Sequence, residues 1–411
     1  MTDQQSRAGR NAGIAAGVAV LLAAGAAGFV WWEGTVFDAA FADFGKRLAD
    51  EGSRTGLTVT AEETDRGFAH RGIALTVQSS GVSLRWTGRA DFGVGTRAVL
   101  HFDPEWGSAP ELAKEGLEGL SDELRVTADV FGRDVRYDWT LKPFRVHGED
   151  GLFCRAEGMT LRGTADFREA DFHWDGMTCE AGAEQLTIGK TDMRYRAEAK
   201  GETFSLTAET GDLGFRGPGE SLEAKTLRLT ASGSPAKKAA EQTAQSSAKA
   251  AADTNDTQER IFDLGYGFEL AGVTLDGVKG LDSTAVKLRL LGVSESFAAA
   301  VTADSAAGDT FAVLDRVGQA FREEGLVLEL DEARLVRDGH RADIAGRMAK
   351  DAARLGAFSV TVDPKIAAGL PYAEFGLLTL QQEGWLKETE GRLTSHIELR
   401  EDGILINGQL L

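Results

Sequence analysis

The stretch LRVTADVFGRDVRYDWTL, residues 124–141, determines the fold class that this sequence predicts. Apolar and polar residues alternate from Leu124 to Val130 and again from Tyr137 to Leu141. A period of two is typical of half-buried β-strands, because successive side chains of a strand point to opposite faces. Phe131-Gly-Arg-Asp134 between the two runs has the composition of a turn. We therefore expect two strands, each with one apolar and one polar face.

The same period continues from Leu57 through most of the chain. Turn signals separate the alternating runs, among them Glu149-Asp-Gly151, Trp174-Asp-Gly176 and Glu401-Asp-Gly403. Short strands joined by tight turns form antiparallel sheets. The sequence thus predicts a mainly β fold: a long curved antiparallel meander sheet with a few covering helices, preceded by one N-terminal transmembrane helix. The other strands expected are Ile73–Val77, Val82–Trp86, Arg97–Phe102, Phe153–Glu157, Met193–Ala199, Phe204–Ala208, Leu222–Leu229, Val286–Leu290 and Leu393–Leu399.

Few segments are available to cover the apolar face of such a sheet. Helical spacing returns only near Phe311–Glu324 and, interrupted by Pro371, in the region Lys365–Leu378. Where these helices do not reach, the sheet either closes on itself as a β core or leaves an open apolar trough. A closed core is the default expectation, since large exposed apolar patches are uncommon in soluble domains. An open trough would suit an acyl chain or the hydrophobic surface of a partner.

The N-terminus predicts a membrane anchor. Residues 13–32 are uncharged and follow Arg7 and Arg10, and about 20 apolar residues suffice to cross a bilayer as a helix. The arginines favour a cytoplasmic N-terminus at residues 1–12 and place the rest of the chain outside the cytoplasm. A signal peptide cleaved near Ala27 is the alternative, because small residues precede that point. The residues that mark the anchor are Gly13, Leu21, Leu22, Phe29, Trp31 and Trp32.

The remaining chain divides into four segments. Residues 33–56 hold an amphipathic helix with Phe37, Phe41 and Leu48 at helical spacing, which we expect to pack on its own domain. Residues 57–231 form an N-terminal β region and residues 261–411 a C-terminal β region with helices. Between them, residues 232–260 are polar, Ala-rich and without a large apolar side chain, so they form a linker or an insertion. Whether the β regions make one domain or two stays open.

Charge and cysteine usage restrict the partners. The formal net charge of −19 argues against binding nucleic acid, whose phosphates require lysine and arginine. Cys154 and Cys179 are the two cysteines, and a disulfide between them is expected in an oxidising compartment. Closing that loop stabilises the folded state by roughly 3 kcal/mol in the chain-entropy model. Neither cysteine has a Cys or His neighbour at ligand spacing, so no metal or cofactor is expected.

Catalytic motifs are not found in the sequence. It contains no Gly-x-Ser-x-Gly elbow, no phosphate-binding Gly-x-x-x-x-Gly-Lys-Ser/Thr loop and no His-Glu-x-x-His helix, and we expect no enzyme. An unrecognised hydrolase would require His173 or an acid from Asp171–Glu180 to meet a nucleophile. Trp86, Trp106, Trp139 and Trp174 could stack on a ligand, but we expect them in the core with their indole N–H groups bonded. The six histidines are scattered: His70, His101, His147, His173, His340 and His396.

The order of these features resembles the YdgA-like family of bacterial envelope proteins of unknown function. The resemblance rests on the anchor ending in Val30-Trp-Trp32, on Arg66-Gly-Phe-Ala-His-Arg-Gly-Ile-Ala-Leu-Thr-Val77 and on Ile397-Glu-Leu-Arg-Glu-Asp-Gly-Ile-Leu-Ile-Asn-Gly408. Leu264–Leu275 and Leu328–Met348 are similar in style. It implies a distant relation to AsmA-like proteins, which are linked to lipid movement and outer-membrane maintenance, and implies no catalytic residues.

An uncharacterised alphaproteobacterial family also pairs an anchor with an Arg-Gly-Phe strand, but has Pro after the Phe, where this chain has Ala69. In either case the expectation is a single-pass protein of the bacterial inner membrane with a periplasmic β body. Its expected function is a binding or structural role in envelope maintenance, holding a lipid or a hydrophobic segment on a concave sheet face. The alternatives are an envelope assembly partner or oligomerising scaffold, with a homo-oligomer left open, and then a hydrolase.

Overall fold

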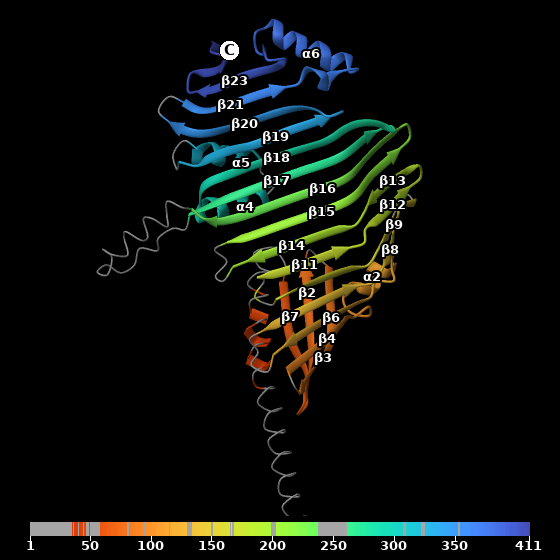
Figure 1. The fold of residues 1–411 in the computed structure, drawn as a ribbon. Helices are drawn as coiled ribbons and strands as arrows, with labels where there is room; N and C mark the ends of the chain where they lie inside the picture. Colours follow the sequence, from red (N-terminus) through yellow and green to blue (C-terminus); the bar gives the residue numbers. More distant parts are fainter. Residues whose placement is uncertain are drawn as a thin grey trace, which may run out of the picture. The chain divides into compact units, whose positions relative to one another are not determined.

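A computed structural model describes the fold in two compact units, Met1–Asp175 and Gly176–Leu411. Both units consist mainly of antiparallel strands, as the alternation of apolar and polar residues predicts, and each is described by itself (Figure 1). The described residues are 35, 37–39, 41–43, 45–46, 49, 58–79, 82–93, 95–114, 116–129, 134–148, 151–164, 166, 168–198, 203–236, 261–306, 310–321, 325–351 and 354–411.

In the first unit, the strands pair in the order β1-β2-β3-β4-β6-β7-β10-β11, every pair antiparallel. A smaller ribbon joins β5, β8 and β9. The elements are β1 (Thr58–Arg66), β2 (His70–Ser79), β3 (Val82–Gly93), β4 (Gly95–Phe102), α2 (Ala109–Lys114), β5 (Leu117–Glu118), β6 (Asp122–Ala128), β7 (Val135–Leu141), β8 (Phe144–His147), β9 (Phe153–Ala156), β10 (Met159–Thr164) and β11 (Glu169–Trp174).

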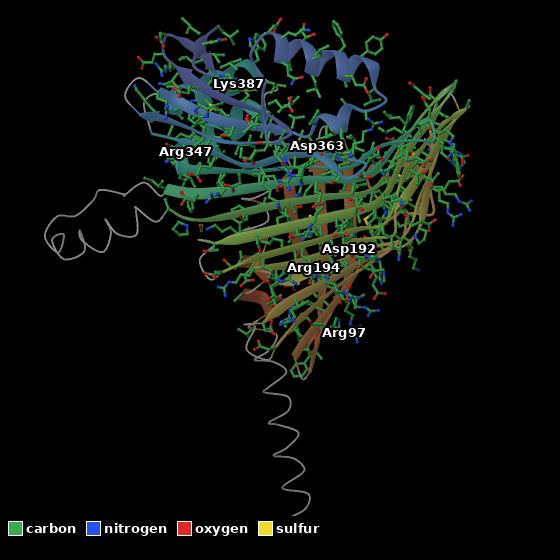
Figure 2. The ribbon with its side chains drawn as sticks, turned by 45° about the horizontal axis from the view of Figure 1, so that its top comes forward. Arg97, Asp192, Arg194, Arg347, Asp363 and Lys387 are labelled. Carbon is green, nitrogen blue, oxygen red and sulfur yellow. The ribbon has the colours of Figure 1, made fainter. Side chains whose placement is uncertain are left out.

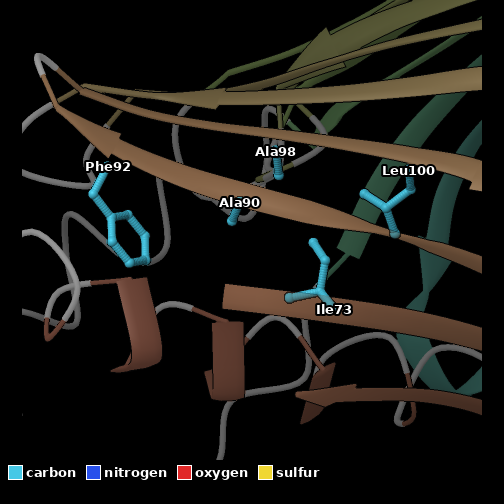
Figure 3. Packing of buried hydrophobic residues seen from close by; sticks show 5 residues of the cluster. All are labelled: Ile73, Ala90, Phe92, Ala98 and Leu100. Atoms are coloured by element: carbon cyan, nitrogen blue, oxygen red, sulfur yellow. The ribbon is translucent and has the colours of Figure 1, made fainter. Parts of the chain in front are cut away.

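The core of the first unit lies on the apolar face of β2, β3 and β4. Figure 3 shows its five buried members, with the ring of Phe92 directed toward turns of helix. Phe37 and Phe41, which belong to the described helical residues between 35 and 49, pack against this core, and their rings stack at 5.4 Å. These two members of the predicted apolar stripe therefore pack on their own unit. The buried members are Ile73, Ala90, Phe92, Ala98 and Leu100.

The second unit is a longer meander. Its strands pair in the order β14-β15-β16-β17-β18-β19-β20-β21-β23-β24-β25. β13 joins β12 to the far end of β15, and β22 pairs with β23. The strands up to β18 are β12 (Met177–Ala181), β13 (Glu184–Ile188), β14 (Thr191–Ala197), β15 (Phe204–Gly217), β16 (Glu220–Pro235), β17 (Ile261–Leu275) and β18 (Val278–Ser294). The later strands are β19 (Val327–Arg337), β20 (His340–Asp351), β21 (Arg354–Val362), β22 (Lys387–Thr389), β23 (Arg392–Arg400), β24 (Gly403–Ile406) and β25 (Gln409–Leu410).

The low-complexity segment connects two neighbouring strands of this sheet. β16 continues through Pro235, and β17 starts at Ile261 and pairs with β16 along its length. The backbone N–H of Ala236 donates to the Ile261 carbonyl at 2.9 Å. Residues 237–260 lie outside the described residues, and the compact units divide at Asp175 and Gly176.

The helices of the second unit are α4 (Glu295–Ala306), α5 (Thr310–Gln319), the short 3-10 helix η3 (Pro364–Ala367) and α6 (Pro371–Gln382). α5 lies in the range where a helix was predicted, whereas α4 was not predicted, because its many alanines conceal the apolar spacing. Pro371 does not interrupt a helix but starts one. Proline suits the first helical turn, where no N–H partner is required.

The predicted transmembrane anchor falls on residues 13–32, which lie outside the described residues. Among the residues that the structure describes, no helix has the length and apolar composition to span a bilayer.

Candidate functional site

One face of the second unit's sheet is apolar across many strands. Directly paired residues of antiparallel strands point to the same face, so Leu229, Phe268 and Val286, which pair in turn, share it. Ala231 and Tyr266 pair one step along, on the same side. From β14 to β20, this face carries Met193, Tyr195, Leu206, Ala208, Leu227, Leu229, Ala231, Tyr266, Phe268, Leu270, Val286, Leu288, Leu330, Ile344 and Met348.

The opposite face is charged and carries cross-strand ion pairs. Arg289 on β18 contacts Asp331 at 2.8 Å, and Lys287 contacts Glu332 at 3.2 Å, both on β19. The guanidinium of Arg289 holds the pKa of Asp331 below its ordinary value. Asp192, Arg194 and Arg347, labelled in Figure 2, belong to the same polar set and are exposed. Solvent is the natural environment of this face, and the apolar face is the one that remains to be explained.

Helices cover the apolar face in two separate places. α4 and α5 pack over Leu264 and Leu290 around the buried side chains Val293, Phe297 and Leu326. η3 and α6 pack over Ala342 and Val360, with Leu377 and Leu380 of α6 in contact with buried Leu386 and Leu393. The two covers therefore lie on the same side of the sheet.

Outside the two covers, apolar side chains of this face are open. Leu229 and Tyr266 are each 43% exposed and Phe268 is 36% exposed, although all three are on central strands. We call Leu206, Leu229, Tyr266, Phe268, Leu288 and Ile344 the open strip. Tyr266 is only two residues from the covered Leu264, and Leu288 two residues from the covered Leu290. On β17 and β18, the cover from α4 and α5 thus ends at one inward-facing residue and the open strip begins at the next.

The open strip offers hydrocarbon and aromatic contacts and no charge. The Tyr266 hydroxyl is its one polar side-chain group. Backbone N–H and C=O groups of the central strands are engaged in the ladders on both sides. Tyr195 and Phe204 stack at a ring distance of 6.4 Å near the β14 end of the same face. This arrangement can hold an uncharged apolar group.

The predicted hydrolase residues lie elsewhere. His173 on β11 contacts Asp175 at 3.4 Å with 40% of its side chain exposed, and Thr160 stands opposite it in the register. His340 bonds Asp363 at 2.8 Å, and His101 approaches the Asp122 carbonyl at 3.0 Å. Each of these histidines therefore has its own acid or carbonyl beside it. No group of His, Cys, Asp and Glu that could hold a metal is found among the described residues.

Two of the four singled-out tryptophans are partly buried and have bonded indoles, as predicted. Trp86 Nε1 donates to Asp122 Oδ2 at 2.5 Å, and Trp139 Nε1 donates to the same oxygen at 2.7 Å. The Arg85 guanidinium lies over the Trp106 ring, 5.5 Å from the centre of that ring. Trp174 differs from the prediction, because its buried indole N–H has no partner among the described residues.

The two cysteines are disulfide-bonded, and the structure has no free thiol. Cys154 is half-buried on β9 and Cys179 is buried on β12. A peptide map under non-reducing conditions is the measurement that tests the pairing. The marker residues of the anchor, from Gly13 to Trp32, lie outside the described residues.

The open-strip residues on β17, Tyr266 and Phe268, were not predicted from the sequence. Their signal is present, since Leu264, Tyr266, Phe268 and Leu270 alternate, but Gly265 and Gly267 weaken the polar half of the pattern. Exposure of a strand face also depends on what covers it, which local spacing does not determine.

Comparison of the chain with protein-family models, with curated proteins and with solved structures finds no match.

Proposed function

We propose that this chain is a non-enzymatic, membrane-anchored protein of the bacterial envelope whose second unit holds the hydrocarbon chain of a lipid on the open strip. The observation that supports this proposal is the exposure of Leu229, Tyr266 and Phe268 on central strands. Contiguous apolar surface of this kind marks a binding site rather than ordinary solvent contact. A tether at residues 13–32 would keep the strip close to membrane lipids.

An acyl chain fits the strip better than a peptide does. A bound peptide must satisfy its own backbone N–H and C=O groups, and burying them unpaired is costly. The central strands beneath the strip are paired on both sides, so they have no backbone partners to offer. Hydrocarbon has no such groups to satisfy. The absence of charge on the strip also matches the apolar part of a lipid rather than its head group.

The size of the apolar face fits as well. Neighbouring strands lie about 4.8 Å apart, so the six steps from β14 to β20 span about 29 Å. A bilayer core of about 30 Å contains two layers of acyl chains, or about 15 Å for each. One chain laid across the strands would therefore occupy about half of the face.

The proposal is tested by photocrosslinking in bacteria with the full-length chain. A photoreactive phenylalanine analogue replaces Phe268, and the adducts are identified by mass spectrometry of the purified protein. We expect adducts with the mass of a lipid. The matched control is the same analogue at Val278, which is 69% exposed at the start of β18, beside the turn of the same hairpin. Lipid adducts at both positions alike, or at neither, would contradict the proposal.

A second candidate function, assembly with another envelope protein or a second copy, is supported by α6. Its inner residues pack on the sheet, yet Tyr372, Phe375 and Leu378 on its outer side are 95%, 70% and 51% exposed. A helix that is apolar on both sides normally has both sides covered. The same photoreactive analogue at Tyr372 tests this function: a cross-linked protein band supports it, and monomer alone counts against it.

A further inference from the structure

We propose that the turn between β1 and β2, which carries Phe68, is a second membrane contact that seats in the lipid interface beside the anchor. This inference rests on the anchor at residues 13–32, which is part of the proposed function, but not on the open strip. Phe68 is 61% exposed between Gly67 and Ala69, the largest exposed fraction of any large apolar side chain described in the first unit.

Two arginines fix this turn to the start of the described helix. Arg71 donates from Nε and Nη2 to the two carboxylate oxygens of Asp38, at 3.0 and 3.2 Å. Arg66 contacts the same carboxylate at 3.3 Å. Arg66 and Arg71 flank the turn on β1 and β2, whereas Asp38 is helical and close to Thr35, the first described residue. The turn therefore lies beside the end of the helix that is nearest to the anchor.

The turn is also braced from within, so its position is defined. Arg71 Nη1 donates to the Gly67 carbonyl at 2.6 Å, and the Gly67 N–H donates to the His70 carbonyl at 3.0 Å. The N–H of Phe92 donates to the Ala69 carbonyl at 2.9 Å, and the Arg71 guanidinium lies 5.2 Å from the centre of the Phe92 ring. These contacts hold every neighbour of Phe68 while its own ring remains open.

The reach of the chain places this turn at the membrane surface. Trp32, the last residue of the apolar segment, precedes Thr35 by three residues, which span at most about 10 Å. Asp38 follows Thr35 by a further three residues, about 4.5 Å in a helix. The Cα atom of Asp38 is thus within about 15 Å of the Cα atom of Trp32. If Trp32 lies in the lipid interface, the turn that Arg66 and Arg71 join to Asp38 lies near that interface, and Phe68 can reach it.

The chemistry of the turn suits a lipid interface. Aromatic side chains are enriched where head groups meet hydrocarbon. The acidity of the chain as a whole does not oppose this contact, because the carboxylates near the turn are paired: Arg66 bonds Glu63 at 2.6 Å, and Asp38 lies between two arginines. His70 contacts Asp65 at 3.1 Å. Each of these carboxylates has a partner, and the two arginines and three carboxylates together carry a formal charge of −1 with His70 neutral.

The test uses the full-length chain in phospholipid vesicles. A Phe68→Cys variant is labelled with an environment-sensitive dye, since the native cysteines are disulfide-bonded and do not react. Phospholipids that carry a nitroxide on the head group are then introduced. We expect the emission to fall by about half, because the dye lies at the depth of the nitroxide. The control is Val82→Cys with the same dye. Val82 starts β3 beside the far end of β2, roughly 30 Å from Phe68, and the emission there should change little.

Vesicle flotation is measured on the same sample. Chain that floats but shows equal emission at the two positions overturns this inference and leaves the anchor intact. Chain that does not float overturns both the anchor and this inference, while the lipid adducts at Phe268 report on the open strip separately.

Discussion

Asp122 is a carboxylate in a position where the sequence pattern of its strand is apolar. It is in phase with Leu124 and Val126 on β6, is 4% exposed, and accepts bonds from two indoles at Oδ2 and from the Phe102 N–H at Oδ1, at 2.7 Å. Three donors satisfy the buried charge. The sequence signal for this residue is the break in phase, which marks a buried polar group that needs partners.

Replacing Asp122 with Asn should destabilise the first unit by about 2–4 kcal/mol, because one amide oxygen cannot serve all three donors and the new NH₂ group faces an existing N–H. Urea unfolding followed by tryptophan emission measures this. The control is Glu123→Gln next to it, which loses only an exposed bond to Arg125 and should change stability by less than about 0.5 kcal/mol. Equal stabilities for the two variants would refute the role assigned to Asp122.

At the scale of elements, the helix near the N-terminus is joined to the sheet by one carboxylate as well as by its two phenylalanines. The Arg71 side chain is only 10% exposed, so it depends on Asp38 for its charge partner. Breaking such a pair leaves a cation poorly solvated, whereas removing both members does not.

Asp38→Ala should therefore cost about 2–3 kcal/mol in the free energy of unfolding, with the described helix around residues 35–49 losing protection first. Hydrogen exchange of the peptides that cover this helix is the readout. The double variant Asp38→Ala with Arg71→Met should recover part of the loss. If the double variant loses more free energy of unfolding than the two single variants lose together, the pair is not the source of the effect.

The segment 237–260 can be shortened without moving the sheet, because its flanking residues Ala236 and Ile261 already bond each other. Replacing its roughly 24 residues with six from Gly, Ser and Asn should stabilise the second unit by about 1 kcal/mol through the smaller loop-closure entropy. Thermal unfolding by circular dichroism measures the change. A loss of stability would mean that the segment makes contacts that the sheet requires.

How much of the fold the sequence predicts depends on the range of the interaction. Strands such as Leu393–Leu399 follow from alternation alone, because burial of one face acts residue by residue. The open strip does not, since exposure of Phe268 depends on where α4, α5 and α6 end, and those limits are set by contacts distant in sequence. Pro371 illustrates a third case: its local meaning was clear, but whether it ends or starts a helix depended on its neighbours.

At the scale of the whole molecule, acid should weaken the second unit. Cationic or imidazole partners lower the pKa of several of its carboxylates below the ordinary values, which are 3.8 for Asp and 4.5 for Glu. Each of these carboxylates therefore contributes stability that is complete above its ordinary pKa. That contribution is lost as the pH falls through the lowered pKa of the folded state. The pairs, each with its strongest partner, are Asp282 with Lys279, Asp331 with Arg289, Asp363 with His340, and Glu398 with Arg400.

We expect the urea midpoint of the second unit to be similar at about pH 7 and pH 6 and to fall between about pH 4.5 and pH 3, the window in which these carboxylates take up protons. Circular dichroism, which reports on both units, is compared at each pH with tryptophan emission, which reports mainly on the first, and the difference gives the midpoint of the second unit. Glu398→Gln removes one of the titrating groups and should flatten the fall. An unchanged slope in that variant, or a midpoint that rises toward acid, would contradict the assignment.

The division at Asp175 and Gly176 gives the two units different optical properties. Of the seven tryptophans, six precede the division and Trp385 alone follows it. Two of the six, Trp86 and Trp139, donate to the buried Asp122 carboxylate, and these hydrogen bonds are lost on unfolding. Ultraviolet emission of the intact chain is therefore dominated by the first unit, whereas backbone dichroism reports on both. Comparing the two signals in one titration separates the melting of the units without a label, a truncation or a mutation.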